Sequence, residues 1–257
     1  MKKTYLILFL FFSIFSVKSQ EQLNKVDLSN YCPYSKTQFE ATCYAYAFAY
    51  TALSISYCVK NNITDRELVE TNAFSSGFIA SIHRKQSFFN PKCGMNGSYD
   101  VDIEIFQKYG CPKLKDFSKD CTTKIPNEVF KKAKETALKE YKYIQDKPDT
   151  SQEAISNIKE ILSKKTPVLI VLNMTDDFSR LGRNCNETLP VLKHEKKSKT
   201  AHDICIIGYD DDSSSKYFGR FLIKNNYEIW GDERNMAWVK YEDMMYMITS
   251  ALYFTID

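Results

Sequence analysis

Three residues that lie far apart in the sequence have side chains that could together carry out nucleophilic chemistry. Cys43 stands at the start of a long apolar run, and a helix N-terminus or a nearby imidazolium lowers the pKa of a thiol. His202 opens a predicted strand and could accept the thiol proton, while Asn225 follows another strand and could orient the imidazole. A cysteine in such a helix is by itself more often a buried or disulfide-bonded residue. The hypothesis of a nucleophile therefore depends on the set of three.

Other kinds of chemistry lack their sequence patterns. There is no Cys-x-x-Cys pair, no His-Glu-x-x-His motif and no glycine-rich phosphate loop, so we expect no metal and no other cofactor. His83 and His194 are expected to be solvated surface histidines. The formal charge is +3, and residues 1–19 carry three lysines and no acid, so the rest of the chain is about neutral. This balance argues against nucleic acid as a partner.

The first nineteen residues have the pattern of an export signal. Lys2 and Lys3 precede an apolar run over 5–17, and small residues precede a cleavage site before Gln20. The run is shorter than the ~20 residues that cross a membrane, although an uncleaved anchor is the alternative. We expect a secreted protein, in an extracellular, periplasmic or lysosome-like compartment, that has no membrane contact after cleavage. Eight cysteines fit an oxidising compartment.

The elements that must position the three residues divide into helices in the first half and strands in the second. Hydrophobic periodicity and capping patterns predict helices over 43–59, 64–70 (with a capping box opening at Thr64), 101–109, 127–143 and 151–164. Apolar β-branched runs predict strands over 168–172, 203–209, 221–224, 236–240 and 250–256, with a long surface loop over 173–200. The order favours an α+β fold with a helical N-terminal lobe (about 27–115) and a β-rich lobe (about 116–257).

Five motifs, in one order along most of the chain, resemble those of the papain-like cysteine peptidases. They are Gln38 followed by Cys43-Tyr-Ala-Tyr-Ala, the short helix at 64–70, Asn96-Gly-Ser-Tyr, the helix-then-strand stretch 158–172, and the stretch 201–231. The last of these is the most specific, because it holds His202, Gly-Tyr, Lys-Asn225 and Trp-Gly in the family's order. The resemblance implies a two-lobed fold with an antiparallel β-rich second lobe and a cleft between the lobes.

The resemblance also implies roles for individual residues. Cys43 would be the nucleophile, His202 the general base and acid, Asn225 the orienting group, and Gln38 the donor of an oxyanion-hole amide. Asn96, Gly97 and Ser98 would line the substrate cleft. These roles predict a secreted peptidase that hydrolyses peptide bonds in peptide or protein substrates through an acyl-enzyme. With 23 residues from Gln20 to Cys43 we expect no inhibitory pro-segment, so latency either comes from elsewhere, such as the redox state or a separate inhibitor, or is not needed.

Several positions depart from the family pattern. Gln38 lies one residue closer to Cys43 than is usual, and Tyr227 replaces a tryptophan that normally shields the His–Asn contact. Asp203 follows His202 where alanine is usual. Two alternatives therefore remain: a catalytically silent relative that binds peptides or a partner, and a thiol transferase or amide hydrolase on the same scaffold.

The cysteine count predicts at least one free thiol besides the nucleophile. Removing Cys43 from eight cysteines leaves seven, and Cys205, inside an apolar strand, is the expected free one. The remaining six allow up to three disulfides, so two free thiols are expected in the unreduced protein. They are Cys32, Cys58, Cys93, Cys111, Cys121 and Cys185.

Overall fold

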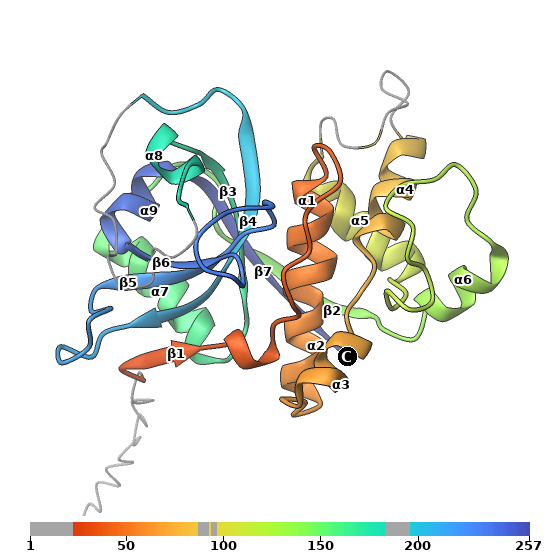
Figure 1. Ribbon diagram of the computed structural model, residues 1–257, viewed down its shortest axis with the longest axis horizontal. Helices are drawn as coiled ribbons and strands as arrows, with labels where there is room; N and C mark the ends of the chain where they lie inside the picture. Colours follow the sequence, from red (N-terminus) through yellow and green to blue (C-terminus); the bar gives the residue numbers. More distant parts are fainter. Residues whose placement is uncertain (1–22, 87–92, 94–96, 183–195) are drawn as a thin grey trace, which may run out of the picture.

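The computed structural model describes residues 23–86, 93, 97–182 and 196–257. Figure 1 shows a sheet on one side, a group of helices on the other, and one long helical run between them. That central run consists of α1 (Cys43–Ala45), the π-helical η2 (Tyr46–Leu53) and α2 (Ser54–Lys60). All side chains over 43–55 are buried, which confirms the prediction of a helix buried on most faces.

Of the other helices in the first half, η1 (Ser29–Tyr31), α4 (Ser76–Gln86) and α5 (Tyr99–Tyr109) pack on this run. Two more, α3 (Arg66–Thr71) and α6 (Asn127–Ala133), complete the group, and Phe130 of α6 packs against Phe78 of α4. The predicted helix over 101–109 ends as expected at Gly110, whose φ of 73° suits glycine. The predicted cap of α3 was one residue off, because Asp65, not Thr64, accepts the hydrogen bond from the Leu68 backbone N–H (3.0 Å).

The strands form one antiparallel sheet in the order β2-β7-β3-β4-β5-β6, with β1 paired to the end of β4. Their bounds are β1 (Lys25–Asp27), β2 (Leu138–Gln145), β3 (Val168–Asn173), β4 (Ala201–Asp210), β5 (Arg220–Lys224), β6 (Met236–Lys240) and β7 (Ile248–Ile256). All five predicted strands are confirmed, whereas β1 was not predicted. Gly208 permits the β1 pairing, because a Cβ there would lie 2.4 Å from the Val26 carbonyl oxygen.

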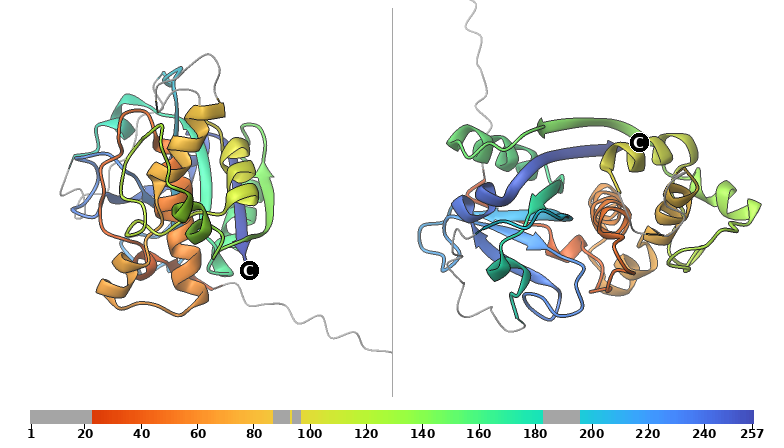
Figure 2. Two further views of the ribbon diagram at one scale, coloured as in Figure 1. Left: turned by 90° about the vertical axis from the view of Figure 1, so that its right-hand side faces the viewer. Right: turned by 90° about the horizontal axis from the view of Figure 1, so that it is seen from above.

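The sheet and the helices share one hydrophobic core. Seen from above in Figure 2, β2 and β7 run side by side along one face, and β2 begins and β7 ends beside the helices. There Phe254 of β7 packs against Phe48 of η2 and Phe106 of α5, with ring centroids 4.8 and 6.2 Å away. Side chains that lie between the helices and the sheet are therefore held by rigid elements from both halves of the chain.

Two sequence predictions about the middle of the chain were wrong. The predicted solvated helix over 127–143 is instead the short helix α6 followed by β2. Strand pairing with β7 overrides helix propensity there, because tertiary contacts outweigh the small energy differences of exposed residues. The predicted loop over 173–200 contains α8 (Asp176–Ser179), which buries Phe178, and residues 183–195 lie outside the described part.

The second half also contains two helices that flank the sheet. The predicted helix over 151–164 is confirmed as α7 (Gln152–Ser163), capped by Ser151, whose hydroxyl accepts from the Ala154 N–H (3.1 Å). The short helix α9 (Tyr241–Met247), which was not predicted from the sequence, links β6 to β7.

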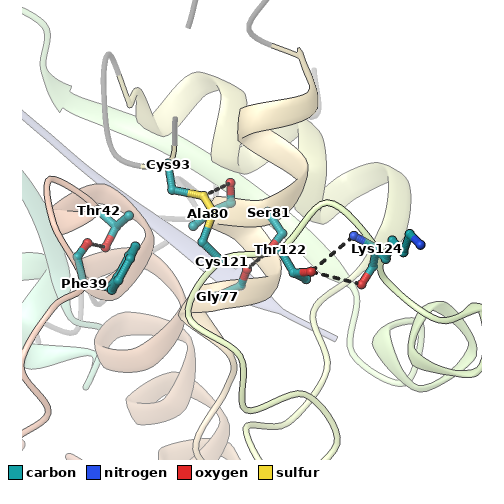
Figure 3. The surroundings of a disulfide bond; sticks show 9 residues. All are labelled: Phe39, Thr42, Gly77, Ala80, Ser81, Cys93, Cys121, Thr122 and Lys124. Carbon is teal, nitrogen blue, oxygen red and sulfur yellow. Dashed lines mark hydrogen bonds between the residues drawn. A yellow bond between two sulfur atoms is a disulfide. The ribbon is translucent and has the colours of Figure 1, made fainter. Parts of the chain in front are cut away.

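One disulfide is present among the described cysteines, between Cys93 and Cys121 (Figure 3). It joins the segment before α5 to the segment before α6. The neighbouring Thr122 N–H donates to the Ser81 hydroxyl of α4 (3.0 Å), which holds the same segment on that helix. The disulfide therefore secures the periphery of the helical group.

The expectation of three disulfides was wrong. Cys32, Cys58 and Cys111 are free and fully or almost fully buried, as is Cys205, for which a free thiol was expected. Cys43 is free as well, and Cys185 lies outside the described residues. Buried cysteine behaves as a small apolar residue, so these thiols contribute by packing rather than by cross-linking.

We expect at least five free thiols when the unreduced protein is unfolded in denaturant. The structure shows five free cysteines and one disulfide among the described residues. A colorimetric thiol titration in denaturant measures the number, and the same titration after reduction should give eight. A count of two, as the sequence alone suggested, would contradict the structure.

Candidate active site

Cys43 begins the central helical run and faces the sheet. It is 9% exposed, and α1 packs against β4. The preceding Thr42 does not cap the helix with its side chain, since its hydroxyl donates to the Phe39 carbonyl (2.5 Å) (Figure 3). The Cys43 sulfur donates a hydrogen bond to Asp203 Oδ2 of β4, over 3.4 Å.

Strand pairing brings His202 and Asn225 together. His202 lies near the start of β4, and Asn225 directly follows the end of β5, which is the antiparallel neighbour of β4. His202 Nε2 lies 2.9 Å from Asn225 Oδ1, and that oxygen also accepts from the Asn226 N–H (2.8 Å). Since an amide oxygen only accepts, Nε2 carries the ring proton in the neutral imidazole. Nδ1 is then the nitrogen that can take up a proton.

One aromatic ring lies against the histidine of the His202–Asn225 pair, and a second aromatic residue is buried nearby in the sequence. The Tyr227 ring stacks on the His202 ring, with centroids 4.5 Å apart and an interplanar angle of 27°. Trp230 is fully buried and donates from its indole nitrogen to the Phe178 carbonyl (2.7 Å). Tyr227 therefore provides an aromatic cover at the position where the family pattern has tryptophan.

Burial keeps both Cys43 and His202 uncharged in this arrangement. It lowers the pKa of His202 to about 4, while the hydrogen bond to Asn225 opposes the shift. Burial also raises the pKa of Cys43, and the Asp203 carboxylate raises it further. Hydrogen bonds from the backbone N–H groups of Asp203 and Tyr44 lower the pKa of Cys43, but these effects are smaller than the increase. The expectation that the helix N-terminus lowers the pKa of Cys43 was therefore wrong for this geometry.

Gln38 lies close to the other site residues through its backbone. Its N–H donates to the Asn226 carbonyl (2.8 Å), which ties the loop before Cys43 to the segment after Asn225. Its side-chain amide donates to the Glu40 carbonyl (2.8 Å), and Glu40 has a φ of 47°. The chain between Gln38 and Cys43 thus makes a tight turn. Within it the Gln38 amide, which was predicted to serve the oxyanion hole, is already hydrogen-bonded to the Glu40 carbonyl.

The segment predicted to line the substrate cleft lies against the residue that follows Cys43. A Cβ on Gly97 would be 1.8 Å from Cδ1 of the Tyr44 ring, so only glycine fits there without rearrangement. Ser98 caps α5 by accepting from the Asp100 N–H (3.2 Å). Asn96 lies outside the described residues.

His83 is not the surface histidine that the sequence suggested. It is 6% exposed, and its ring lies 4.7 Å from the Tyr44 ring, centroid to centroid. Burial lowers its pKa. The error followed from missing α4, whose packing against α1 carries His83 into the core. His194 lies outside the described residues.

Asp203 is the residue at the site to which the sequence analysis gave no role. Its only sequence signal was an acid in place of the usual alanine after the histidine.

In the described part of the chain, no three His, Cys, Asp or Glu side chains are grouped so that they could hold a metal ion. Nor does any helix there have the length and apolarity to cross a membrane.

Comparison with known proteins identifies the family. The model of the papain family cysteine proteases matches residues 41–256, so the chain belongs to the papain family, whose members are peptide-bond hydrolases. No curated protein is similar to the sequence at a significant level.

Solved structures with the same fold include three cysteine proteases of different origin. Xylellain from Xylella fastidiosa has a TM-score of 0.66 at 17% identity, covering 91% of this chain and 86% of its own. Procathepsin L 3 of the Tenebrio molitor larval midgut has a TM-score of 0.65 at 15% identity, covering 93% and 71%. Bromelain from Ananas comosus, solved with the E64 inhibitor, has a TM-score of 0.62 at 15% identity, covering 91% and 100%.

Proposed function

We propose that this protein is a secreted cysteine peptidase that cleaves peptide bonds with Cys43, His202 and Asn225. The observation that carries the proposal is the hydrogen bond between His202 Nε2 and Asn225 Oδ1. This hydrogen bond leaves Nδ1 of His202 as the proton acceptor. His202 lies on β4, the strand that packs against α1, which bears Cys43. A thiol at a helix start and an oriented imidazole on the facing strand are the two groups that thiol acyl transfer needs.

The reaction proceeds in two halves. The Cys43 proton passes to His202 Nδ1, and the thiolate attacks the peptide carbonyl to form a tetrahedral intermediate. The Cys43 N–H and the Gln38 side-chain amide stabilise the oxyanion once that amide has turned away from the Glu40 carbonyl. The imidazolium then protonates the departing amine, and water releases the acyl group by the reverse sequence of proton transfers.

The substrates are peptides or proteins, bound along the segment Asn96, Gly97 and Ser98. The closeness of Gly97 to the Tyr44 ring supports this proposal, because Tyr44 directly follows Cys43 in the sequence. A separate inhibitor is proposed as a further partner. We also propose that residues 1–19 are a signal that is removed, and that 20–257 form the peptidase domain.

Covalent labelling by the epoxide E-64 tests the nucleophile directly. We expect the wild-type protein to gain the mass of one inhibitor on the peptide that contains Cys43, because the epoxide reacts with an activated thiol next to a proton donor. Cys43→Ala should not be labelled, whereas Cys58→Ala, which removes a buried thiol from the same helical run, should be labelled like wild type. Labelling on any other cysteine would contradict the assignment.

A silent relative that binds peptides is the second candidate function. Two observations favour it: the Gln38 amide is engaged by the Glu40 carbonyl, and the pKa of the Cys43 thiol is raised. Such a protein would bind peptides without cleaving them and would not react with E-64. The labelling experiment therefore separates the two candidates.

A further inference from the structure

A carboxylate contacts the sulfur of the candidate nucleophile. Asp203 Oδ2 accepts the hydrogen bond from Cys43 Sγ at 3.4 Å, and the two residues are 7% and 9% exposed. Asp203 lies two residues from Cys205, so both side chains point to the same face of β4. Cys205 donates to the Ala47 carbonyl (3.2 Å), one helical turn beyond Cys43. These two hydrogen bonds, from Cys43 to Asp203 and from Cys205 to Ala47, join β4 to the central helical run and hold Asp203 beside the thiol.

In the described part of the structure, Asp203 has no positively charged partner to balance it. The titratable groups that face it are Cys43 from α1, Tyr99 and Asp102 from α5, and Cys205 from β4, beside its chain neighbour His202. Within the described residues no lysine or arginine forms an ion pair with Asp203.

Asp102 adds to the acidic character of this region. Both of its carboxylate oxygens are buried without a hydrogen-bond partner in the described part of the chain. The pKa of Asp102 is raised well above its ordinary value, first by burial and then by Asp203. Burial and Asp203 thus favour the neutral form of Asp102, and Asp203 is the group whose charge raises the pKa of the thiol.

The charge of Asp203 changes close to neutral pH. Burial raises its pKa to about 7, against the opposing effect of the hydrogen bond from Cys43. Above this pH the carboxylate is ionised. It then accepts a hydrogen bond from the Cys43 S–H group and would repel a thiolate at the same position. Below it the carboxyl group is neutral, and the repulsion is absent. The pKa of His202 is shifted by burial and by Asn225 and not by Asp203, so Asp203 affects the pKa of the thiol rather than that of the imidazole.

We propose that Asp203 is a positioning residue that holds Cys43 as a hydrogen-bonded thiol while it is ionised, and releases it for reaction when it is protonated. The inference rests on Cys43 being the nucleophile of the proposed function. On acidification Asp203 takes one proton from solvent and keeps it. The thiol proton then passes to His202 Nδ1, so the reacting state contains a neutral carboxyl group, a thiolate and an imidazolium.

Alkylation of Cys43 by iodoacetamide, followed by mass spectrometry across pH 5.5–8.5, tests this inference. Asp203→Asn keeps the size of the side chain and removes its charge, and Asp203→Ala introduces the residue usual in the family pattern. Asp100→Asn is the matched control, because Asp100 lies on α5 but is exposed and bonded to Tyr143. Circular dichroism checks that each variant is folded.

We expect Asp203→Asn to be alkylated about tenfold faster than wild type at pH 8.5, because each unit of thiol pKa changes the thiolate population tenfold. The ratio should fall to near one at pH 5.5, where the native carboxyl group is already neutral. Asp203→Ala should behave alike, and Asp100→Asn should follow wild type at every pH. A ratio that does not change with pH, or slower alkylation of Asp203→Asn throughout, would overturn the inference.

The wild-type profile gives a test that needs no variant. It should show an inflection near pH ~7, from Asp203, superimposed on the titration of the thiol. A profile that fits a single thiol would also overturn the inference. Neither readout requires peptide hydrolysis, so the two failures are distinguishable. A protein that fails to cleave peptides but shows the pH-dependent ratio would reject the proposed function and retain only the control of the Cys43 thiol by Asp203.

Discussion

Replacing Cys43 by alanine should abolish peptide hydrolysis while the protein remains folded. The expected loss in kcat/KM is roughly 10⁶-fold, the size found when a protease nucleophile is removed, because the acyl-enzyme can no longer form. The side chain is small and lies at the edge of the core, so little cavity results. Hydrolysis of a fluorogenic peptide library measures the effect.

The matched control for this variant is Cys58→Ala. Cys58 is a buried free cysteine at the far end of the same helical run, and its loss removes a thiol without touching the site. It should keep the wild-type rate. If Cys43→Ala retained a substantial part of the activity, the nucleophile would have to be another residue.

His202→Ala should reduce kcat/KM by more than Asn225→Ala does. Loss of His202 removes the group that accepts and returns the proton, at a cost of roughly 10⁴-fold. Loss of Asn225 leaves the imidazole in place under the Tyr227 ring and removes the hydrogen bond that fixes its tautomer, so a loss of roughly 10²-fold is expected. Single-turnover kinetics on both variants separate the chemical step from binding.

A conservative variant tests whether Asn225 acts by accepting the Nε2 proton. Asn225→Asp also presents an oxygen to His202 and should retain more activity than Asn225→Ala. Equal losses for His202→Ala and Asn225→Ala, or a larger loss for the latter, would contradict the roles assigned here.

The sequence by itself predicted five of the seven strands in the described sheet, the central helical run, and the helices α3, α5 and α7. Apolar β-branched runs such as 168–172 and the buried helix over 43–59 carry a strong local signal, because burial on both faces demands continuous apolar residues. The exposed strand β2 and the buried helix α4 escaped detection. Their form depends on pairing with β7 or packing on α1, which local propensity does not encode.

The order of motifs predicted which residues would form the site, and strand pairing explains why His202 and Asn225 meet. Only the tertiary structure decided the charge state of the site and the cysteine pairing. Burial disfavours both thiolate and imidazolium, and the depth of burial is a property of the packed molecule rather than of a motif. The contact between Cys43 and Asp203 likewise joins residues 160 positions apart, and it exists because the helix and the strand pack together.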